Sequence, residues 1–483
     1  MNAPVRRLSL LVGILFASLL VSTTLIQYVF AADLNARPDN RRTLLSTYAR
    51  DRGDILVGER AIATSEESDD EFKYQRIYSP GERYAHVTGF YSFYGASGGL
   101  EQSENALLSG SSDKLFYRRV SDLFTGRRPQ GATIETTLDA AVQKAADDGL
   151  QGVKGAAVAL DPSTGAVLAL VSHPTFDPNS VAGHDLGEVE QNYAALNDDP
   201  DRPLVDRAIA GDLYPPGSTF KVVTAAAALT SGEYTPESTL YGGAVLDLPQ
   251  TDAGLPNHDG VACSPTGEIS LTDALVVSCN PAFGEIGLDL GGAALQDQAD
   301  RFGFGDTVQI PMRVTPSSVP SDMNPPQTAQ AAIGQYDVRV TPVQMAMVAA
   351  GVGNRGRVMQ PYLVQSVIGS DLSVIETSSP TELSEAVPSD VAAQLRDMMV
   401  QVVQRGTGVA AQIPGVDVAG KTGTAEHGDE GKAHSWFIAF APADDPEIAV
   451  AVVVENGAVA GSEDSSSKAA PIARSMMEAR LDG

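Results

Sequence analysis

The chain has few of the residue types that usually bind metals. Its 483 residues include only two cysteines and six histidines, and these form neither an H-E-x-x-H motif nor a Cys/His cluster. Transition metals in proteins are held by such groupings of imidazole and thiolate ligands. The sequence therefore predicts no metal site and no cofactor.

Positive charge is also scarce. The chain carries 33 lysines and arginines against 61 aspartates and glutamates, a formal net charge of −28. This charge repels phosphate backbones and argues against nucleic acid as a partner; solubility explains the acidity more simply. A chain of this length with 43% apolar residues exceeds one ordinary core, so two or more globular domains are expected.

The two cysteines are Cys263 and Cys279. In an oxidising compartment an isolated pair is a disulfide candidate, and the bond would close a loop of about 16 residues, worth ~3 kcal/mol in the chain-entropy model. The alternative is two free, buried thiols.

Charge is absent from Leu8 to Ile26, a run long enough to cross a bilayer core of ~30 Å. We expect a cytoplasmic stub at 1–7 and a transmembrane anchor at 8–30, giving a single-pass protein of the cell membrane. A cleaved secretory signal is the alternative, because residues 29–31 resemble a peptidase site. Both hypotheses place the remaining chain outside the cytoplasm.

Two regions of different texture follow. Residues 33–148 are polar and arginine-rich, which suggests a small, irregular domain, whereas residues 149–483 alternate strand and helix patterns. Apolar runs separated by turn residues predict β-hairpins at 155–179 and 434–457, and helical spacing predicts a last helix at 467–481. Hairpins at both ends with helices between them indicate an α+β fold whose outer strands come from opposite ends of the domain.

Only eight lysines occur in the chain, so their positions are informative. In the stretch YPPGSTFKVVTAAAALTSG, Ser218 begins an alanine-rich helix that Gly232 should end, and Lys221 lies one turn further on the same face. A neutral lysine there can take the serine proton, provided that burial and nearby positive charge lower its pKa.

A lone S-x-x-K motif is weak, since Ser111–Lys114 and Ser465–Lys468 also match it within polar loops. The chain also contains S-x-N at 278–280, where a helical run meets Asn-Pro, and K-T-G at 421–423; a chance S-x-N occurs at 103–105. The three motifs in this order within one domain form a strong signal.

In these motifs the chain resembles the class B penicillin-binding proteins, of the short actinobacterial type. Further matching stretches are residues 52–55, 155–174, 332–346, 406–408 and 421–426. The resemblance implies the serine β-lactamase/penicillin-binding transpeptidase fold, with a central antiparallel sheet and a helical subdomain, carried on a membrane anchor and a non-catalytic, dimerisation-like pedestal. One departure is Tyr336-Asp337, where small residues are expected, so the cleft wall should differ.

The resemblance also implies catalytic roles for four residues. Ser218 would be the acylated nucleophile and Lys221 its base, while Ser278 and Asn280 would complete the proton relay and hold the substrate amide. The reaction would be peptidoglycan D,D-transpeptidation by a ping-pong route, in which terminal D-alanine leaves and an amine of a neighbouring stem peptide resolves the acyl-enzyme. β-Lactams would mimic the donor and acylate Ser218.

Substrate binding is implied for the residues around the K-T-G motif. Lys421 would supply positive charge, and the hydroxyls of Thr422 and Thr424 would bind the carboxylate of a D-alanyl-D-alanine stem peptide. Gly423, with Gly420, would let the substrate backbone approach. Backbone N–H groups of Ser218 and Thr424 would form the oxyanion hole. The resemblance also implies a polytopic membrane glycosyltransferase as a partner.

Three other functions match part of the sequence. Residues 415–422 also match a P-loop, but residues 423–429 would make a poor first helical turn, so we expect a strand at 416–425 and no bound nucleotide. A D,D-carboxypeptidase or β-lactamase of the same fold would need a water-activating base, and no E-x-x-L-N segment lies between Asn280 and Lys421. A non-catalytic β-lactam sensor or scaffold is the third alternative.

Overall fold

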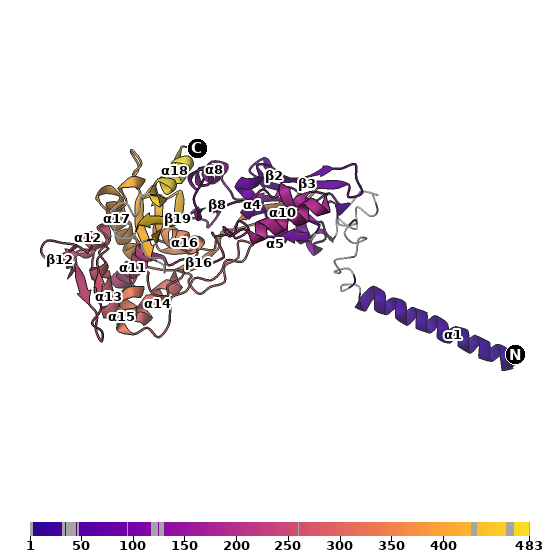
Figure 1. The fold of residues 1–483 in the computed structure, drawn as a ribbon, viewed down its shortest axis with the longest axis horizontal. Helices are drawn as coiled ribbons and strands as arrows, with labels where there is room; N and C mark the ends of the chain where they lie inside the picture. The colour runs from indigo at the N-terminus through magenta and orange to yellow at the C-terminus, as the bar shows by residue number, and fades with distance from the viewer. Residues whose placement is uncertain are drawn as a thin grey trace.

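The structure is a computed structural model of the whole chain (Figure 1). It describes the chain except residues 1–2, 31–33, 35–44, 46–47, 94, 117–123, 125–129, 259, 427–431, 460–467 and 483.

The N-terminal helix has no buried residue. It comprises α1 (Ala3–Thr24) and a continuing π-helical turn (Leu25–Val29), and its mean hydropathy is 2.3 over an 18-residue window. At 1.5 Å per residue its 27 residues span about 40 Å, more than a bilayer core. By length and composition this helix can cross a membrane, although a secretory signal passes the same test. It begins five residues before the predicted anchor.

An antiparallel five-stranded sheet forms the centre of the C-terminal region, in the order β17-β18-β19-β7-β8. The predicted hairpins are present as β7 (Gly155–Leu160) with β8 (Val167–His173), and as β18 (Lys432–Ala441) with β19 (Ile448–Val459). Strand β17 (Ala419–Glu426) forms the far edge. The outer strands therefore come from opposite ends of the domain, as the sequence predicts.

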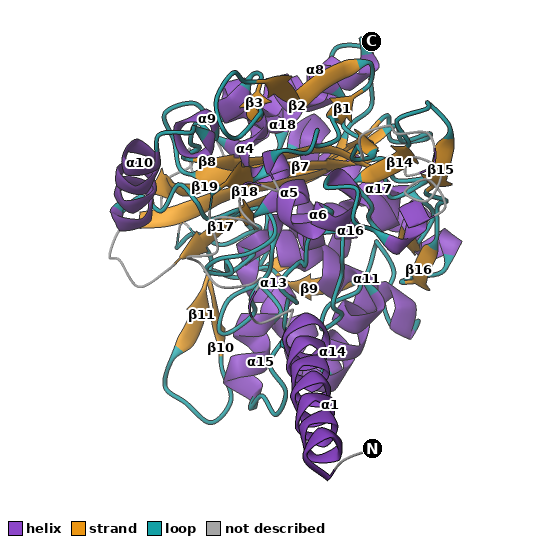
Figure 2. Cartoon of the chain, turned by 90° about the vertical axis from the view of Figure 1, so that its right-hand side faces the viewer, coloured by secondary structure: helices purple, strands orange, loops and turns teal. Residues whose placement is uncertain are grey.

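Helices cover both faces of this sheet. Alternate residues of β7 belong to different cores, Ala156 and Val158 to one and Ala157 and Ala159 to the other, as the period-2 geometry of a strand requires. Helices α8 (Ala140–Gly149) and α18 (Ala469–Leu481) cover one face, and α16 (Pro342–Gly353) covers the other (Figure 2). Helix α8 thus packs on this sheet although it precedes the expected boundary at residue 149.

The helical subdomain surrounds α11 (Lys221–Ser231). Every residue from Lys221 to Leu229 is buried, because alanine side chains let neighbouring helices approach closely. Helix α11 ends, as predicted, at Gly232 in the left-handed conformation with φ 76°. Helices α13 (Asn280–Leu290), α14 (Gly292–Arg301) and α17 (Ser389–Arg405) pack against it, while α12 (Leu271–Val276) packs on α17 and α15 (Pro325–Ala331) on α13.

The N-terminal region contains more regular structure than its sequence suggested. A six-stranded sheet has the order β15-β14-β6-β1-β2-β3, and four of its strands are β1 (Ile55–Val57), β2 (Arg60–Glu67), β3 (Tyr74–Tyr78) and β6 (Thr133–Thr136). These strands are short and only half-buried, so their polar residues resemble loop sequence. The other two, β14 (Val364–Ile368) and β15 (Val374–Thr377), come from beyond residue 149, a pairing that no sequence pattern predicts.

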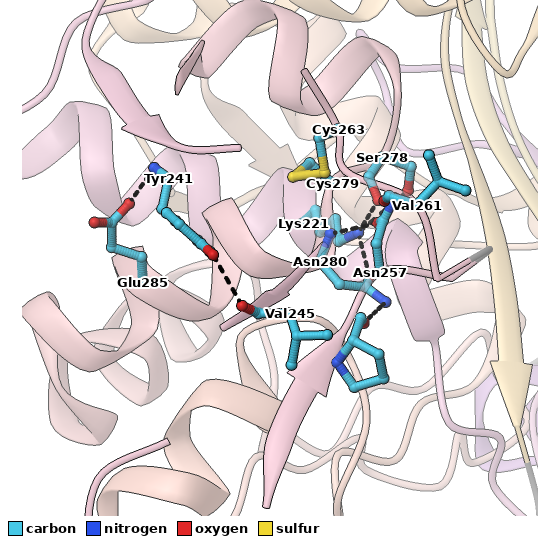
Figure 3. Close-up of a disulfide and its surroundings, with 11 residues drawn as sticks. Lys221, Tyr241, Val245, Asn257, Val261, Cys263, Ser278, Cys279, Asn280 and Glu285 are labelled. Carbon is cyan, nitrogen blue, oxygen red and sulfur yellow. Dashed lines mark hydrogen bonds between the residues drawn. A yellow bond between two sulfur atoms is a disulfide. The ribbon is translucent and has the colours of Figure 1, made fainter. Parts of the chain in front are cut away.

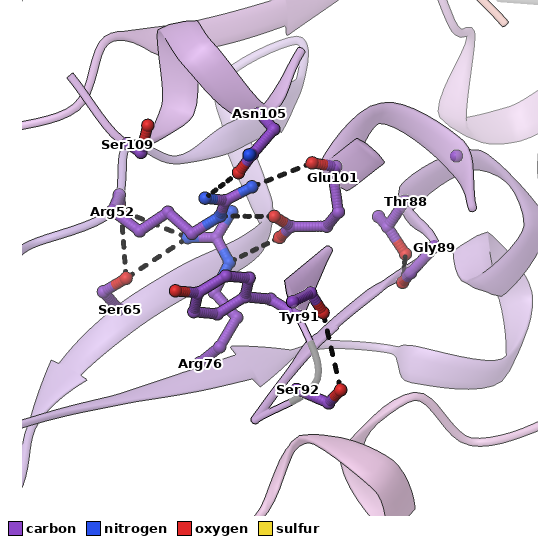
Figure 4. A network of polar contacts seen from close by, with 12 residues as sticks. Arg52, Ser65, Arg76, Thr88, Gly89, Tyr91, Ser92, Glu101, Asn105 and Ser109 are labelled. Atoms are coloured by element: carbon purple, nitrogen blue, oxygen red, sulfur yellow. Dashed lines mark hydrogen bonds and ion pairs between the residues drawn. The ribbon is translucent and has the colours of Figure 1, made fainter. Parts of the chain in front are cut away.

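A buried ion cluster holds this region together. The fully buried Glu101 carboxylate accepts from Arg52 Nε at 2.5 Å and from Arg76 Nε at 2.7 Å (Figure 4). Arg52 also donates to Asn105 Oδ1 at 2.8 Å. Burial raises the pKa of Glu101, but the two guanidinium groups outweigh burial and hold that pKa below its usual value. The Arg52-Gly53-Asp54 stretch therefore supports the pedestal's interior.

We predict that Glu101→Gln lowers the free energy of unfolding by roughly 3–5 kcal/mol, because it leaves two buried cations without a countercharge. Urea unfolding of the full chain in detergent, followed by far-UV circular dichroism, measures the change. The wild-type contribution is present above the usual carboxyl pKa and is lost as pH falls through the lowered one, so the deficit should shrink in acid. The exposed Glu66→Gln on β2 is the control; equal midpoints for both variants would contradict the prediction.

Candidate active site

Ser218 lies at the start of a helix, pressed against the edge strand β17. It belongs to a 3-10 turn (Gly217–Phe220) that continues directly into α11, so the predicted first-turn position is correct. Gly217 has φ 53°, and a Cβ there would lie 2.3 Å from the carbonyl oxygen of Thr424. Only glycine permits this approach, which brings half-buried Ser218 beside the strand.

Lys221, one helical turn after Ser218, is completely buried. Its Nζ donates to the Ser278 carbonyl oxygen at 2.5 Å, to Asn280 Oδ1 at 2.7 Å and to Ser278 Oγ at 3.2 Å (Figure 3). Burial, and then the positive charge of Lys421, hold the pKa of Lys221 well below its usual value. The two conditions set out from the sequence for a neutral lysine, burial and a nearby cation, are therefore both met.

The S-x-N turn between α12 and α13 is held by a neighbouring segment. Ser278 adopts a left-handed conformation with φ 61°, and Cys279 forms a disulfide with Cys263. Asn280 donates from its backbone N–H to Asn257 Oδ1 at 3.2 Å and from Nδ2 to the Pro256 carbonyl at 3.1 Å. Three connections therefore join residues 256–263 to this turn (Figure 3). No motif in the sequence indicates the Asn257 contact.

Lys421 also contacts Ser278. This fully buried residue of β17 donates from Nζ to Ser278 Oγ and to the Thr422 carbonyl, each at 2.9 Å. Burial lowers the pKa of Lys421 to about 7. The Ser278 hydroxyl thus bridges two buried amino groups whose pKa values are both depressed.

Gly423 of the K-T-G motif and the nearby Gly420 lie in close contact with neighbouring parts of the protein. A Cβ on Gly423 would lie 2.9 Å from Thr219 Cγ2 and 3.0 Å from both the Pro216 carbonyl oxygen and Trp436 Cβ. A Cβ on Gly420 would likewise meet the Phe437 ring at 2.7 Å. Both glycines therefore let β17 pack closely. That they also make room for substrate stays a prediction.

A cavity of about 560 Å³ opens above these groups. Ser218, Ser278, Asn280, Thr422, Gly423 and Thr424 line it, whereas both lysines are buried. Asn257, His258, Thr407 and Glu426 also line the cavity, although the motifs do not assign them to the site. The hydroxyls of Thr407 and Thr422 lie 2.6 Å apart; the GTG stretch at 406–408 was the available signal. Tyr336 also lines the cavity, as its departure from the family pattern suggested.

The other motif matches lie elsewhere. Lys114 pairs with Glu376, and Asn105 accepts from Arg52 in the pedestal, while Ser465 is outside the described residues. The P-loop hypothesis fails because Lys421 lies within β17, paired with β18 from Ala419 to Glu426, and begins no helix. Among the residues that the structure describes, no group of three or more His, Cys, Asp or Glu residues could hold a metal ion.

Comparison with known families agrees with this geometry. Residues 155–478 match the penicillin binding protein transpeptidase domain. The chain belongs to the class B penicillin-binding proteins. Residues 52–134 of this penicillin-binding protein match the penicillin binding protein A dimerisation domain. The family prediction from the three motifs is therefore confirmed.

Mycobacterial proteins are similar over the full length. The peptidoglycan D,D-transpeptidase PbpA of Mycolicibacterium smegmatis is 44% identical, with 100% of this chain and 99% of the relative covered. Its namesake in Mycobacterium tuberculosis is 43% identical over all of both chains. The crystal structure of penicillin-binding protein A from M. tuberculosis has a TM-score of 0.87 at 43% identity, covering 90% of this chain and 100% of that one. A penicillin G acyl-enzyme complex of the same protein has a TM-score of 0.86, at 43% identity and with 89% and 100% covered.

We predict that Gly423→Ala slows acylation by labelled penicillin on the order of tenfold or more, because the new methyl group must push the Ser218 turn away from β17. The measurement is the second-order acylation rate constant of the full chain. Gly187→Ala at the exposed start of α10 (Leu186–Asp198) is the control, since its Cβ meets only Asp185 Oδ1 at 3.5 Å. An unchanged rate in Gly423→Ala would show that the close packing is dispensable.

Proposed function

We propose that the chain is a peptidoglycan D,D-transpeptidase that works through an acyl-enzyme on Ser218. The observation that carries the proposal is the buried, readily neutralised Lys221 amino group, one helical turn from a serine that opens on the cavity. The names of the mycobacterial relatives and the β-lactam acyl-enzyme complexes of a structural neighbour support it.

In the acylation step Lys221 removes the Ser218 proton, and the serine oxygen attacks the carbonyl carbon of the penultimate D-alanine. Neutral Lys221 donates to the Ser278 carbonyl and to Asn280 Oδ1, which leaves its lone pair for the proton. The backbone N–H groups of Ser218 and Thr424 stabilise the oxyanion. The proton passes to the leaving amine, and D-alanine departs.

The Ser278 hydroxyl serves as the relay in both half-reactions. It contacts Lys221 Nζ at 3.2 Å and Lys421 Nζ at 2.9 Å, so a proton can move between the amino groups and the cavity. In the second half-reaction the acceptor amine loses its proton through this relay and attacks the acyl carbon. The ester bond to Ser218 then breaks, and the proton returns to the serine oxygen. Asn280 keeps one N–H for the substrate amide, since Nδ2 has two donors and Pro256 takes one.

The donor carboxylate is held at the β17 side of the cavity. Thr422 and Thr424 supply hydroxyl donors, and Thr407 orients Thr422 through the 2.6 Å contact. Lys421 adds positive charge from beneath while it remains protonated. A binding site for one carboxylate in an otherwise acidic protein favours substrates that end in a free carboxyl group.

The placement at the membrane follows the same proposal. Helix Ala3–Val29 anchors the protein, with residues 1–7 on the cytoplasmic side, residues 33–148 as pedestal and residues 149–483 as catalytic domain outside the cytoplasm. The Cys263–Cys279 disulfide supports an oxidising location. Family resemblance suggests a polytopic membrane glycosyltransferase as partner, which would deliver uncross-linked glycan.

The first test is labelled penicillin with full-length protein in detergent. We expect stoichiometric covalent labelling that persists for many minutes, and none in Ser218→Ala. Labelling of Ser218→Ala would refute the nucleophile, and an acyl-enzyme lifetime of seconds would favour a β-lactamase-type hydrolase. A stable acyl-enzyme without cross-linking of stem peptides would favour a sensor, and release of D-alanine to water alone a carboxypeptidase.

The second test is the pH profile of acylation. The rate should rise with pH as Lys221 loses its proton at a pKa well below the usual lysine value, and fall above about pH 7 as Lys421 loses its charge. Lys421→Arg, which stays charged, should weaken the alkaline decline even if the absolute rate drops. An alkaline limb that is identical in both proteins would contradict the role given to Lys421.

A further inference from the structure

Each of the four residues before Ser218, residues 214–217, forms a hydrogen bond through its backbone. The hydrogen bonds are, in chain order, Tyr214 N to Val340 O (3.0 Å) and Val340 N to Tyr214 O (2.8 Å), Trp436 Nε1 to Pro215 O (3.1 Å), Thr219 Oγ1 to Pro216 O (2.7 Å) and Gly217 N to Gly334 O (2.9 Å). Each of these bonds uses a backbone group of residues 214–217. The side chain of Tyr214 adds a polar contact of a different kind.

Tyr214 donates its hydroxyl proton to Glu455 Oε1 at 2.7 Å. Burial, and then the Glu455 carboxylate, raise the pKa of Tyr214, so the hydroxyl stays a donor. The tyrosine is 5% exposed, and its ring meets the Trp436 ring edge-on at 5.9 Å. Because Trp436 binds the next residue's carbonyl, a shift of the Tyr214 ring would reach Pro215 by two routes.

Glu455 is itself fixed on both sides. It lies in β19, its backbone N–H donates to the Lys154 carbonyl at 2.7 Å, and the same Oε1 accepts from Arg207 Nε at 2.9 Å. The Arg207 guanidinium is nearly buried and also donates to the carbonyls of Asp201 at 2.7 Å and Arg202 at 3.1 Å. The acceptor for Tyr214 is therefore a carboxylate in a rigid, charge-assisted arrangement.

We infer that Tyr214 and Glu455 are positioning residues that hold the Ser218 turn at attacking distance. Neither residue lines the substrate cavity, so they act through the position of Ser218 and not by contact with substrate. The inference rests on the proposed role of Ser218 as nucleophile. Covalent attack is sensitive to shifts of about 1 Å, which can cost ~100-fold in rate, whereas binding of the β-lactam carboxylate depends on residues of β17.

The test separates the acylation rate constant from the dissociation constant of the non-covalent penicillin complex, using stopped-flow kinetics on the full chain in detergent. Tyr214→Phe and Glu455→Ala should each lower the rate constant on the order of tenfold and leave the dissociation constant within about twofold. The double variant should be no slower than the worse single variant, because the two residues share one hydrogen bond.

A conservative variant tests the hydrogen bond itself. In Glu455→Gln the amide oxygen can take the place of Oε1 and accept from Tyr214. The amide nitrogen then takes the place of Oε2, which has no partner among the described residues. The acylation rate constant should then recover to within about threefold of wild type, although the charge facing Arg207 is lost. A variant that only disturbed folding would show no such recovery.

Tyr78→Phe is the matched control. Tyr78 is also buried and donates its hydroxyl to a carboxylate paired with arginine, Glu101 Oε1 at 3.1 Å, but it belongs to the pedestal. It should lower the melting temperature as Tyr214→Phe does, without changing the acylation rate constant. The inference is overturned if both tyrosine variants slow acylation equally, or if only the dissociation constant changes. It is also overturned if the effects of Tyr214→Phe and Glu455→Ala on the rate constant add in the double variant. Labelling of Ser218→Ala would instead overturn the proposed function, so the two failures are distinguishable.

Discussion

The burial of the Lys221 amino group is the constraint on which the rest of the site depends. A buried ammonium group is strongly disfavoured unless acceptors surround it, and here the Ser278 carbonyl, the Ser278 hydroxyl and the Asn280 amide all contact it. These groups converge only because the S-x-N turn has an uncommon left-handed residue at its centre. The disulfide and the Asn257 contact hold that turn. Cys263 and Asn257 therefore help to keep the acceptors around the Lys221 amino group in place.

A second buried lysine, Lys421, lies close enough for its positive charge to repel that of Lys221. Two fully buried amino groups share contact with one hydroxyl, and each disfavours the charge on the other. Burial lowers both pKa values, and the charge on Lys421 acts in addition on the pKa of Lys221, so Lys221 can accept a proton while Lys421 can still be charged. The overall charge of −28 thus coexists with a small, buried cationic centre.

The sequence sufficed for features that local rules determine. Gly232 ends α11 and Ser218 falls in the first turn, because glycine conformation and helix capping act over a few residues. The strand at the K-T-G motif is expected because residues 423–429 would make a poor helical turn. The sequence did not suffice where partners are distant in the chain. Asn257 binds the Asn280 backbone, Thr407 meets Thr422, and Gly423 faces Thr219; none of these pairs leaves a periodic or compositional trace. The pedestal strands were missed for a related reason, since half-buried strands with charged outer residues resemble loops.

The sheet of the N-terminal region has a consequence for the modularity of the protein. Strand β14, from the catalytic half of the chain, pairs with β6 through residues Val364 to Ile368, and β6 in turn pairs with β1. A cut between the halves at residue 149 would leave β14 with an unpaired edge, the kind of edge on which strands from other molecules add. The pedestal and the catalytic domain therefore share one sheet. An exchange of the pedestal between family members would have to include residues 364–377.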